Sequence, residues 1–265
     1  MKRQVLTILM VAVASMVVAA QNEKKNVAYI DTPVDEYQAE RCRLDVYAPD
    51  GAQKLPIVVF FHGGGLEGGN KFIPTEMKDK GVVVISPNYR LSPRATAPAY
   101  IEDAAAAVAW AIRNAETIGG DAKHVYVTGH SAGGYLTLML ALDKSYLAKH
   151  DIDADSLAGY IPLSGQTNTH YTIRKERGVD MEIPMIDKYA PLYHARKLVP
   201  PMVLVTGARE LEMTSRFTEN LHLQETMRVK GAEVELYELD GFDHGTMFEP
   251  GCLFVLRMVR RHSEP

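Results

Sequence analysis

The stretch HVYVTGHSAGG, residues 124–134, decides the fold prediction for this chain. Its first five residues are rich in β-branched and aromatic side chains, which favour a strand. The following residues, 129–133, fit the pattern G-x-S-x-G, in which a serine stands on a sharp turn between a strand and a helix. The pattern therefore predicts that the Ser131 hydroxyl is exposed at the end of a sheet.

Segments typical of strands and helices alternate on both sides of this stretch. Apolar or alternating runs typical of strands occupy residues 41–47, 55–61, 82–86, 124–128, 157–163, 202–206 and 233–239. Segments typical of helices occupy residues 100–118, 136–142, 215–230 and 253–261. This alternation predicts an α/β fold with a mostly parallel central sheet and helices on both faces. Ligands bind at the carboxyl ends of such strands, so reactive residues should directly follow them.

The composition is that of one soluble globular domain, expected over residues 21–265. The chain has 265 residues, of which 46% are hydrophobic and 23% charged. A formal net charge of -4 without a dense basic run argues against nucleic-acid binding. Residues 165–197 interrupt the alternation, and we interpret them as an insertion near the site, either a lid or a plain surface excursion.

The first twenty residues have the layout of a secretory signal peptide. The positive start MKR is followed by the apolar run VLTILMVAVASMVV, and small residues stand before Gln21. The apolar run is shorter than the roughly 20 residues of a spanning helix, which favours a cleaved signal over a membrane anchor. We therefore expect a bacterial protein exported to the periplasm or the medium, without stable membrane insertion after cleavage.

The chain offers few candidates for disulfide or metal chemistry. Its only cysteines are Cys42 and Cys252, which we expect to be buried free thiols, although a disulfide between them stays open. The sequence contains no H-E-x-x-H pattern, no paired C-x-x-C and no Asp/Asn-rich loop. We therefore expect neither a metal nor another cofactor.

A serine hydroxyl becomes a good nucleophile only when a base accepts its proton and a carboxylate orients that base. His244 is the candidate base for Ser131. It lies in the Gly-flanked loop DGFDHG that follows the last expected strand. The chain order nucleophile, acid, histidine places the base at this point.

The acid should follow the expected strand at residues 202–206. Glu210 is our choice in the loop GARELE, and Glu212 is its rival. Asp243 ranks lower because side chains adjacent in sequence rarely face one another. Asp240 would reach the histidine only if its loop doubled back.

The string His62-Gly63-Gly64-Gly65 directly follows the buried strand expected at residues 55–61. Glycines after a strand expose backbone N–H groups that can stabilise an oxyanion, and HGGG is a pattern of esterase oxyanion holes. The alternatives are a flexible glycine turn and a phosphate-binding loop, but G-x-x-x-x-G-K-[ST] is absent. We expect His62 to brace the loop rather than to transfer protons.

Together these motifs resemble the α/β-hydrolase superfamily, and within it the hormone-sensitive-lipase-like and small bacterial carboxylesterases. The matching residues are HGGG at 62–65, NYRLSP at 88–93, Asp103, GHSAGG at 129–134 and DHG at 243–245. The resemblance implies that the amides of Gly64, Gly65 and Ala132 form the oxyanion hole. The chain departs from the family in His130, where many relatives have Asp, and in a glutamate where the usual acid is Asp.

The sequence thus predicts a serine carboxylesterase in which Ser131, His244 and Glu210 hydrolyse short-chain acyl esters through an acyl-enzyme. The N-terminal cap of the lipase-like group is missing, and an open site would suit acetyl or feruloyl esters on plant polysaccharide. The partner is then a small ester or an acylated carbohydrate. A formamidase or amidase of the same fold and a non-catalytic carbohydrate- or protein-binding scaffold are the alternatives. The acyl group, the alcohol and the oligomeric state stay open.

Overall fold

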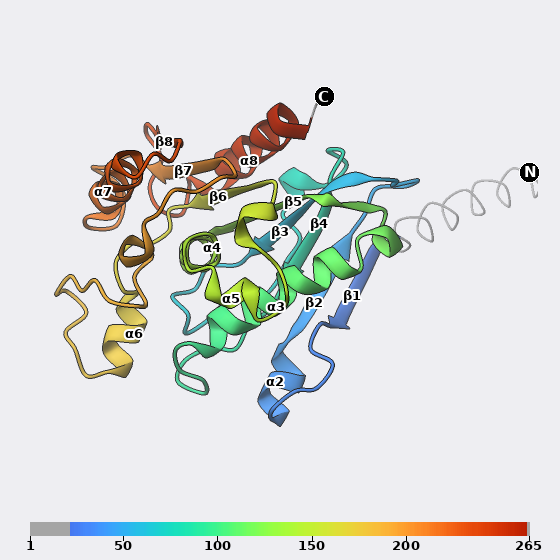
Figure 1. Ribbon diagram of the computed structural model, residues 1–265, viewed down its shortest axis with the longest axis horizontal. Coiled ribbons are helices and arrows are strands. Elements are labelled where there is room, and N and C mark those ends of the chain that lie inside the picture. Colours follow the sequence, from blue (N-terminus) through green and yellow to red (C-terminus); the bar gives the residue numbers. More distant parts are fainter. Residues whose placement is uncertain (1–21, 264–265) are drawn as a thin grey trace, which may run out of the picture.

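The computed structural model describes residues 22–263, so the expected signal peptide lies outside the described residues. Eight strands form one sheet in the order β1-β2-β4-β3-β5-β6-β7-β8, which runs from right to upper left in Figure 1. They are β1 (Glu23–Ala28), β2 (Arg43–Tyr47), β3 (Leu55–Phe61), β4 (Val83–Pro87), β5 (Gly120–His130), β6 (Gly159–Leu163), β7 (Met202–Gly207) and β8 (Val234–Leu239). β1 and β2 pair antiparallel with their neighbours, and all pairs from β4 to β8 are parallel. The predicted mostly parallel sheet is confirmed.

Helices cover both faces of the sheet. They are α2 (Glu36–Arg41), α3 (Ala99–Arg113), α4 (Ala132–Leu142), α5 (Ser145–Ala148), α6 (Tyr171–Glu176), α7 (Arg216–Val229) and α8 (Phe248–Ser263), with short 3-10 turns at η1 (Thr75–Met77), η2 (Glu116–Ile118), η3 (Ala154–Ser156) and η4 (Pro191–His194). Successive side chains of β3 point to opposite faces. Val59 packs in the hydrophobic cluster that contains α3, α4 and α7, whereas Val58 packs in the cluster that contains α8. The sheet is therefore buried on both sides.

Most expected strands agree with the structure to within a few residues, but the helix expected at residues 100–118 ends at Arg113, and α2, α5 and α6 were not expected. The edge strand β1 was not expected, because its sequence EKKNVA is largely polar and exposed. The segment expected as one strand at residues 41–47 begins inside α2 and becomes extended only at Arg43. Asp35 begins α2, since its side chain accepts a hydrogen bond from the Gln38 amide.

The insertion at residues 165–197 contains α6 and η4 and is tied to the rest of the domain at several points. The Thr172 hydroxyl donates to the carbonyl oxygen of Gly65. The Tyr135 hydroxyl donates to the carbonyl oxygen of Tyr189 at 2.8 Å. Arg196 Nη2 donates to a carbonyl of α4 at 2.7 Å. The insertion therefore packs beside the glycine loop and α4, and its movement as a lid stays a prediction.

The two cysteines are buried free thiols, as expected. Cys42 directly follows α2 and belongs to the hydrophobic cluster of α3 and α4. Cys252 lies in α8 and belongs to the cluster on the other face of the sheet. Because the sheet separates them, the two thiols do not form a disulfide in this fold.

Asp103 of α3 organises the segment NYRLSP at residues 88–93. Its carboxylate is buried and accepts four hydrogen bonds, from Gln38 Nε2 at 2.8 Å, the Arg90 amide at 2.9 Å, and Arg90 Nε and Nη2 at 2.8 Å each. The two carboxylate oxygens thus neutralise a guanidinium that is itself mostly buried. This ion pair joins α2, α3 and the segment after β4.

We expect Asp103→Ala to lower the free energy of unfolding by about 3–5 kcal/mol, because it leaves the Arg90 charge buried without a partner. Urea denaturation followed by circular dichroism measures the change. The control is Glu102→Ala on the same helix, which removes only an exposed ion pair with Lys149 and should cost less than about 1 kcal/mol. Equal losses in the two variants would contradict the role given to Asp103.

Candidate active site

Ser131 stands on a tight turn between β5 and α4. Its backbone has φ 58° and ψ -113°, a conformation that costs a non-glycine residue about 1–3 kcal/mol. The Ser131 amide donates to the carbonyl oxygen of Leu163 at 2.9 Å, and the Ser131 carbonyl accepts from the Tyr135 amide at 2.9 Å. A Cβ on Gly133 would collide with the carbonyl oxygen of Phe61, so only glycine permits α4 to begin this close to β3. The predicted strand–turn–helix around Ser131 is present.

A continuous chain of hydrogen bonds leads from Ser131 into the protein. Ser131 Oγ lies 2.9 Å from Nε2 of His244, and Nδ1 of the same imidazole lies 2.9 Å from Oε2 of Glu212. His244 is in the loop between β8 and α8, and Glu212 follows β7. The structure therefore brings together the two predicted residues Ser131 and His244, with a carboxylate behind them.

The carboxylate is Glu212, and the preferred prediction of Glu210 is wrong in geometry. Residues 208–212 form a single helical turn in which the Glu212 amide donates to the carbonyl oxygen of Ala208 at 2.8 Å. Residues two apart on such a turn point about 200° away from each other. Glu212 turns inward, with a side chain that is 0% exposed, while Glu210 points to solvent. The lower-ranked Asp243 and Asp240 are exposed as well.

Glu212 is held in its charged form by the groups around it. Its Oε1 accepts from Ser164 Oγ at 2.6 Å and from the Gly207 amide at 3.1 Å, and its Oε2 accepts from the Met213 amide at 2.9 Å. Burial acts to raise the pKa of Glu212, but the hydrogen bonds from His244 and Ser164 lower it to about 2. A full negative charge therefore faces the imidazole at neutral pH.

Two residues that support this series of hydrogen bonds were not predicted from the sequence to do so. Ser164 directly follows β6, and its hydroxyl lies within hydrogen-bond distance of both Glu212 and His244 Nδ1, the latter at 3.0 Å. His130 lies beside the nucleophile, and its Nε2 donates to the backbone carbonyl of His244 at 2.7 Å. Ser164 could have been found from the sequence, because it directly follows an expected strand, where site residues gather. We found no sequence signal for the role of His130.

The glycine loop passes next to the nucleophile. A Cβ built on Gly63 would lie 3.4 Å from Cβ of Ser131. Within residues 22–263, no hydrogen bond of the protein uses the amides of Gly64, Gly65 or Ala132. These three amides therefore have no acceptor within the described residues.

His62 at the start of this loop is a structural residue, as expected. Its ring stacks on Tyr89 with centroids 4.5 Å apart and an interplanar angle of 13°. Nδ1 lies 2.6 Å from the carbonyl oxygen of Gly63, and Arg41 Nη2 lies 3.4 Å from Nε2. Burial lowers the pKa of His62 to about 4, so the imidazole is neutral at neutral pH.

A cavity of about 460 Å³ lies between the insertion at residues 165–197 and the segment that follows β7. Met213 lines it and is covalently joined to Glu212. Tyr171 also lines it and stands against Gly65, where a Cβ would collide with the Tyr171 hydroxyl. The cavity therefore lies next to the glycine loop and to the segment that carries Glu212.

Residues 22–263 show neither a metal-binding cluster nor a membrane-spanning helix. No group of three or more His, Cys, Asp or Glu side chains is placed to hold a metal ion. No helix in this part of the chain combines the length and apolar character needed to cross a membrane.

The buried histidines His62 and His130 make stability depend on pH. Burial, with the charge of His244, lowers the pKa of His130 to about 4, and burial gives His62 a similar value, against about 6.5 in an unfolded chain. Between about pH 4 and about pH 6.5 the unfolded state binds more protons than the folded state. The free energy of unfolding therefore falls as the pH drops from about 6.5 to about 4. We expect each histidine to lower the free energy of unfolding by about 2 kcal/mol between pH 7 and pH 5.

Urea denaturation at the two pH values measures this loss. His170 is also buried with a lowered pKa and adds to the loss, so His130→Gln should make the total about 2 kcal/mol smaller, whereas the exposed control His222→Gln should leave it intact. A loss that is the same in His130→Gln as in the wild type would show that His130 does not contribute.

Comparisons with known proteins agree with the fold and the motifs. The family model named BD-FAE matches residues 44–173, slightly less than half of the chain. A probable isoprenylcysteine alpha-carbonyl methylesterase of Oryza sativa subsp. japonica is 25% identical over 236 residues, which are 78% of this chain and 55% of that protein. Esterase LipC of Mycobacterium tuberculosis is 26% identical over 249 residues, 84% of this chain and 59% of that protein. The chain thus spans less than two thirds of the length of both relatives.

Solved structures share the architecture over most of the chain. A structure described as a truncated form of carbohydrate esterase from gut microbiota superposes with a TM-score of 0.75 at 17% identity, covering 91% of this chain and 96% of that one. At this identity the likeness shows a common fold. The sheet, the turn at Ser131 and this neighbour show that the chain has an α/β-hydrolase fold, and its sequence is similar to those of esterases.

Proposed function

We propose that this protein is a serine carboxylesterase that hydrolyses short-chain acyl esters through a triad of Ser131, His244 and Glu212. The observation that carries the proposal is the unbroken hydrogen-bonded path from Ser131 Oγ to the buried Glu212 carboxylate. A serine on a non-catalytic scaffold would need neither the strained turn nor a buried acid behind the histidine. The path therefore favours an enzyme.

In the proposed reaction, Ser131 Oγ attacks the ester carbonyl carbon while His244 Nε2 accepts the hydroxyl proton. Glu212 holds the proton on Nδ1, so that Nε2 carries the free lone pair that the reaction needs. The imidazolium then gives its proton to the leaving alcohol as the ester bond breaks. Water attacks the acyl-enzyme with the same histidine as base, and the acid product leaves Ser131 free.

The oxyanion formed in each half of the reaction needs donors that are already in place. We assign this role to the amides of Gly64, Gly65 and Ala132. Their support is the passage of the glycine loop beside Ser131 and the absence of other acceptors for these amides within residues 22–263. Ala132 opens α4, and the positive end of the helix dipole adds to the stabilisation.

For the substrate we propose a small ester or an acylated carbohydrate, including acetyl or feruloyl groups on plant polysaccharide. The support is the description of one structural neighbour as a carbohydrate esterase. Export through the sequence at residues 1–20 would bring the enzyme to such a polymer. An amidase or formamidase would use the same triad, but the relatives named above are esterases.

Ser131→Ala should lower the kcat for 4-nitrophenyl acetate by about 10⁴-fold or more, because no other group can form the acyl-enzyme. The release of 4-nitrophenolate measures the rate. Thermal melting should stay close to that of the wild type, and the surface control Ser145→Ala should keep full activity. Turnover retained in Ser131→Ala would overturn the proposed function.

Glu212→Gln should lower kcat by roughly 10³- to 10⁴-fold, because an amide favours the wrong tautomer of His244 and cannot stabilise the imidazolium. Glu210→Gln is the matched control and should stay within about twofold of the wild type. Steady-state kinetics on the same ester separates the two variants. A larger loss in Glu210→Gln would restore Glu210 as the acid.

A further inference from the structure

The cavity beside the triad contains two arginine side chains that are nine-tenths buried or more. Arg174 of α6 is 4% exposed and Arg216 at the start of α7 is 3% exposed, and both line the cavity. Arginine stays charged at any physiological pH. Two cations from different segments therefore face one space next to Glu212 and Ser164.

The two guanidinium groups have unused hydrogen-bond donors. Arg174 Nη1 donates to the carbonyl oxygen of Ile183, but its Nε is buried and has no hydrogen-bond partner within residues 22–263. Arg216 Nη1 donates to the carbonyl oxygen of Ser164, and its Nε has no hydrogen-bond partner either. A buried donor without an acceptor costs about 1–3 kcal/mol, more where the group is charged. The protein thus compensates each buried guanidinium charge only in part, and an anion in the cavity that both residues line would supply counter-charge.

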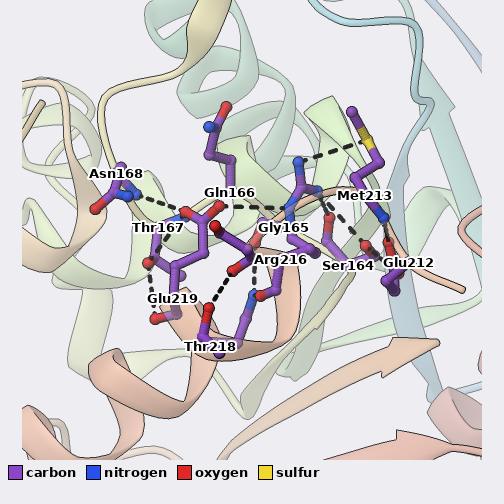
Figure 2. Close-up of polar contacts among 12 residues, drawn as sticks. Ser164, Gly165, Gln166, Thr167, Asn168, Glu212, Met213, Arg216, Thr218 and Glu219 are labelled. Carbon is purple, nitrogen blue, oxygen red and sulfur yellow. Dashed lines mark hydrogen bonds and ion pairs between the residues drawn. The ribbon is translucent and has the colours of Figure 1, made fainter. Parts of the chain in front are cut away.

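The protein itself supplies only one buried carboxylate to these cations, that of Glu219, among the residues lining the cavity. Glu219 Oε1 lies 3.7 Å from Arg216 Nε, beyond hydrogen-bond distance. Its Oε2 is occupied by the amides of Thr167 and Asn168 at 2.8 Å and 3.1 Å. Figure 2 shows Arg216 between Ser164 on one side and Glu219 on the other.

The remaining acid on the cavity wall is Glu182, which is exposed and therefore screened by water. Burial lowers the pKa of Arg174, the direction expected for a cation that lacks a close counter-ion. Apolar side chains, including Met181 and Met213, form other parts of the wall. The cavity thus combines an apolar lining with donors that suit a carboxylate.

We propose that the enzyme prefers esters that carry a carboxylate, and that Arg174 and Arg216 bind this carboxylate in the cavity beside Ser131. The inference rests on the proposed esterase function and specifies its substrate class. A carboxylate has two oxygens that accept bidentate hydrogen bonds from a guanidinium, and such charge-assisted bonds are about twice as strong as neutral ones.

Matched esters test the preference. On the acyl side, mono-(4-nitrophenyl) glutarate is compared with 4-nitrophenyl pentanoate, and on the alcohol side 4-acetoxybenzoate is compared with 4-acetoxybenzamide. We expect kcat/KM to be about 10- to 100-fold higher for the charged member of one pair, and that pair identifies the side of the ester that enters the cavity. Equal or higher kcat/KM for the neutral member of both pairs would overturn the inference.

Arg174→Gln should lower kcat/KM for the preferred charged ester by about tenfold or more and leave its neutral partner within about twofold. Arg174→Lys should restore part of the preference if charge is what matters. Lys188→Gln removes an exposed positive charge from the same insertion, outside the cavity lining, and should change neither ester. Equal losses for both esters in Arg174→Gln would assign Arg174 a purely structural role and contradict the inference.

Measurements of binding affinity test the carboxylate site independently of the proposed esterase activity. Calorimetry with Ser131→Ala measures the Kd of the intact charged and neutral esters, which this variant should not hydrolyse. We expect the charged ester to bind about tenfold tighter or more, and Arg174→Gln in the same background to abolish the difference. Hydrolysis without a difference in affinity or kcat/KM would overturn only the carboxylate site. Preferential binding by a protein that hydrolyses neither ester would overturn only the esterase assignment.

Discussion

Helix α4 begins against the carbonyl oxygen of Phe61 at the end of β3, and the rest of the site depends on this close approach. Because Gly133 has no side chain, α4 can start directly after the turn. Ser131 then lies at the carboxyl end of β5. Residues 62–65 continue from the same end of β3 and pass beside Ser131. One backbone contact thus sets the position of the nucleophile relative to the glycine loop.

The charge behind the histidine is stabilised inside the protein rather than by water. Glu212 accepts hydrogen bonds from two backbone amides, from the Ser164 hydroxyl and from His244. These donors are held by β6, β7 and the loop after β8, so they do not reorganise when charge develops on the imidazole. Removing one donor would leave a buried carboxylate short of a partner, which costs more than an average hydrogen bond contributes.

The sequence was sufficient to predict the sheet, Ser131 and His244, because each depends on a pattern within one segment. A buried strand followed by small residues specifies where a side chain emerges from a parallel sheet. Choosing between Glu210 and Glu212 needed the path of a short loop, since one helical turn sends the two carboxylates in opposite directions. The polar edge strand β1 carried no alternation to reveal it.

The cavity and the triad are linked through Ser164. Arg216 contacts the Ser164 carbonyl, while the Ser164 hydroxyl contacts Glu212 and His244. In the proposed complex, a carboxylate would satisfy Arg216 on the side that faces the cavity and fix its guanidinium against Ser164. Binding energy from a charge remote from the reacting bond would then help to orient the ester at Ser131, which is how remote contacts raise kcat/KM. An enzyme that selects its substrate by charge in this way needs its arginines buried, because water would weaken the same contacts at the surface.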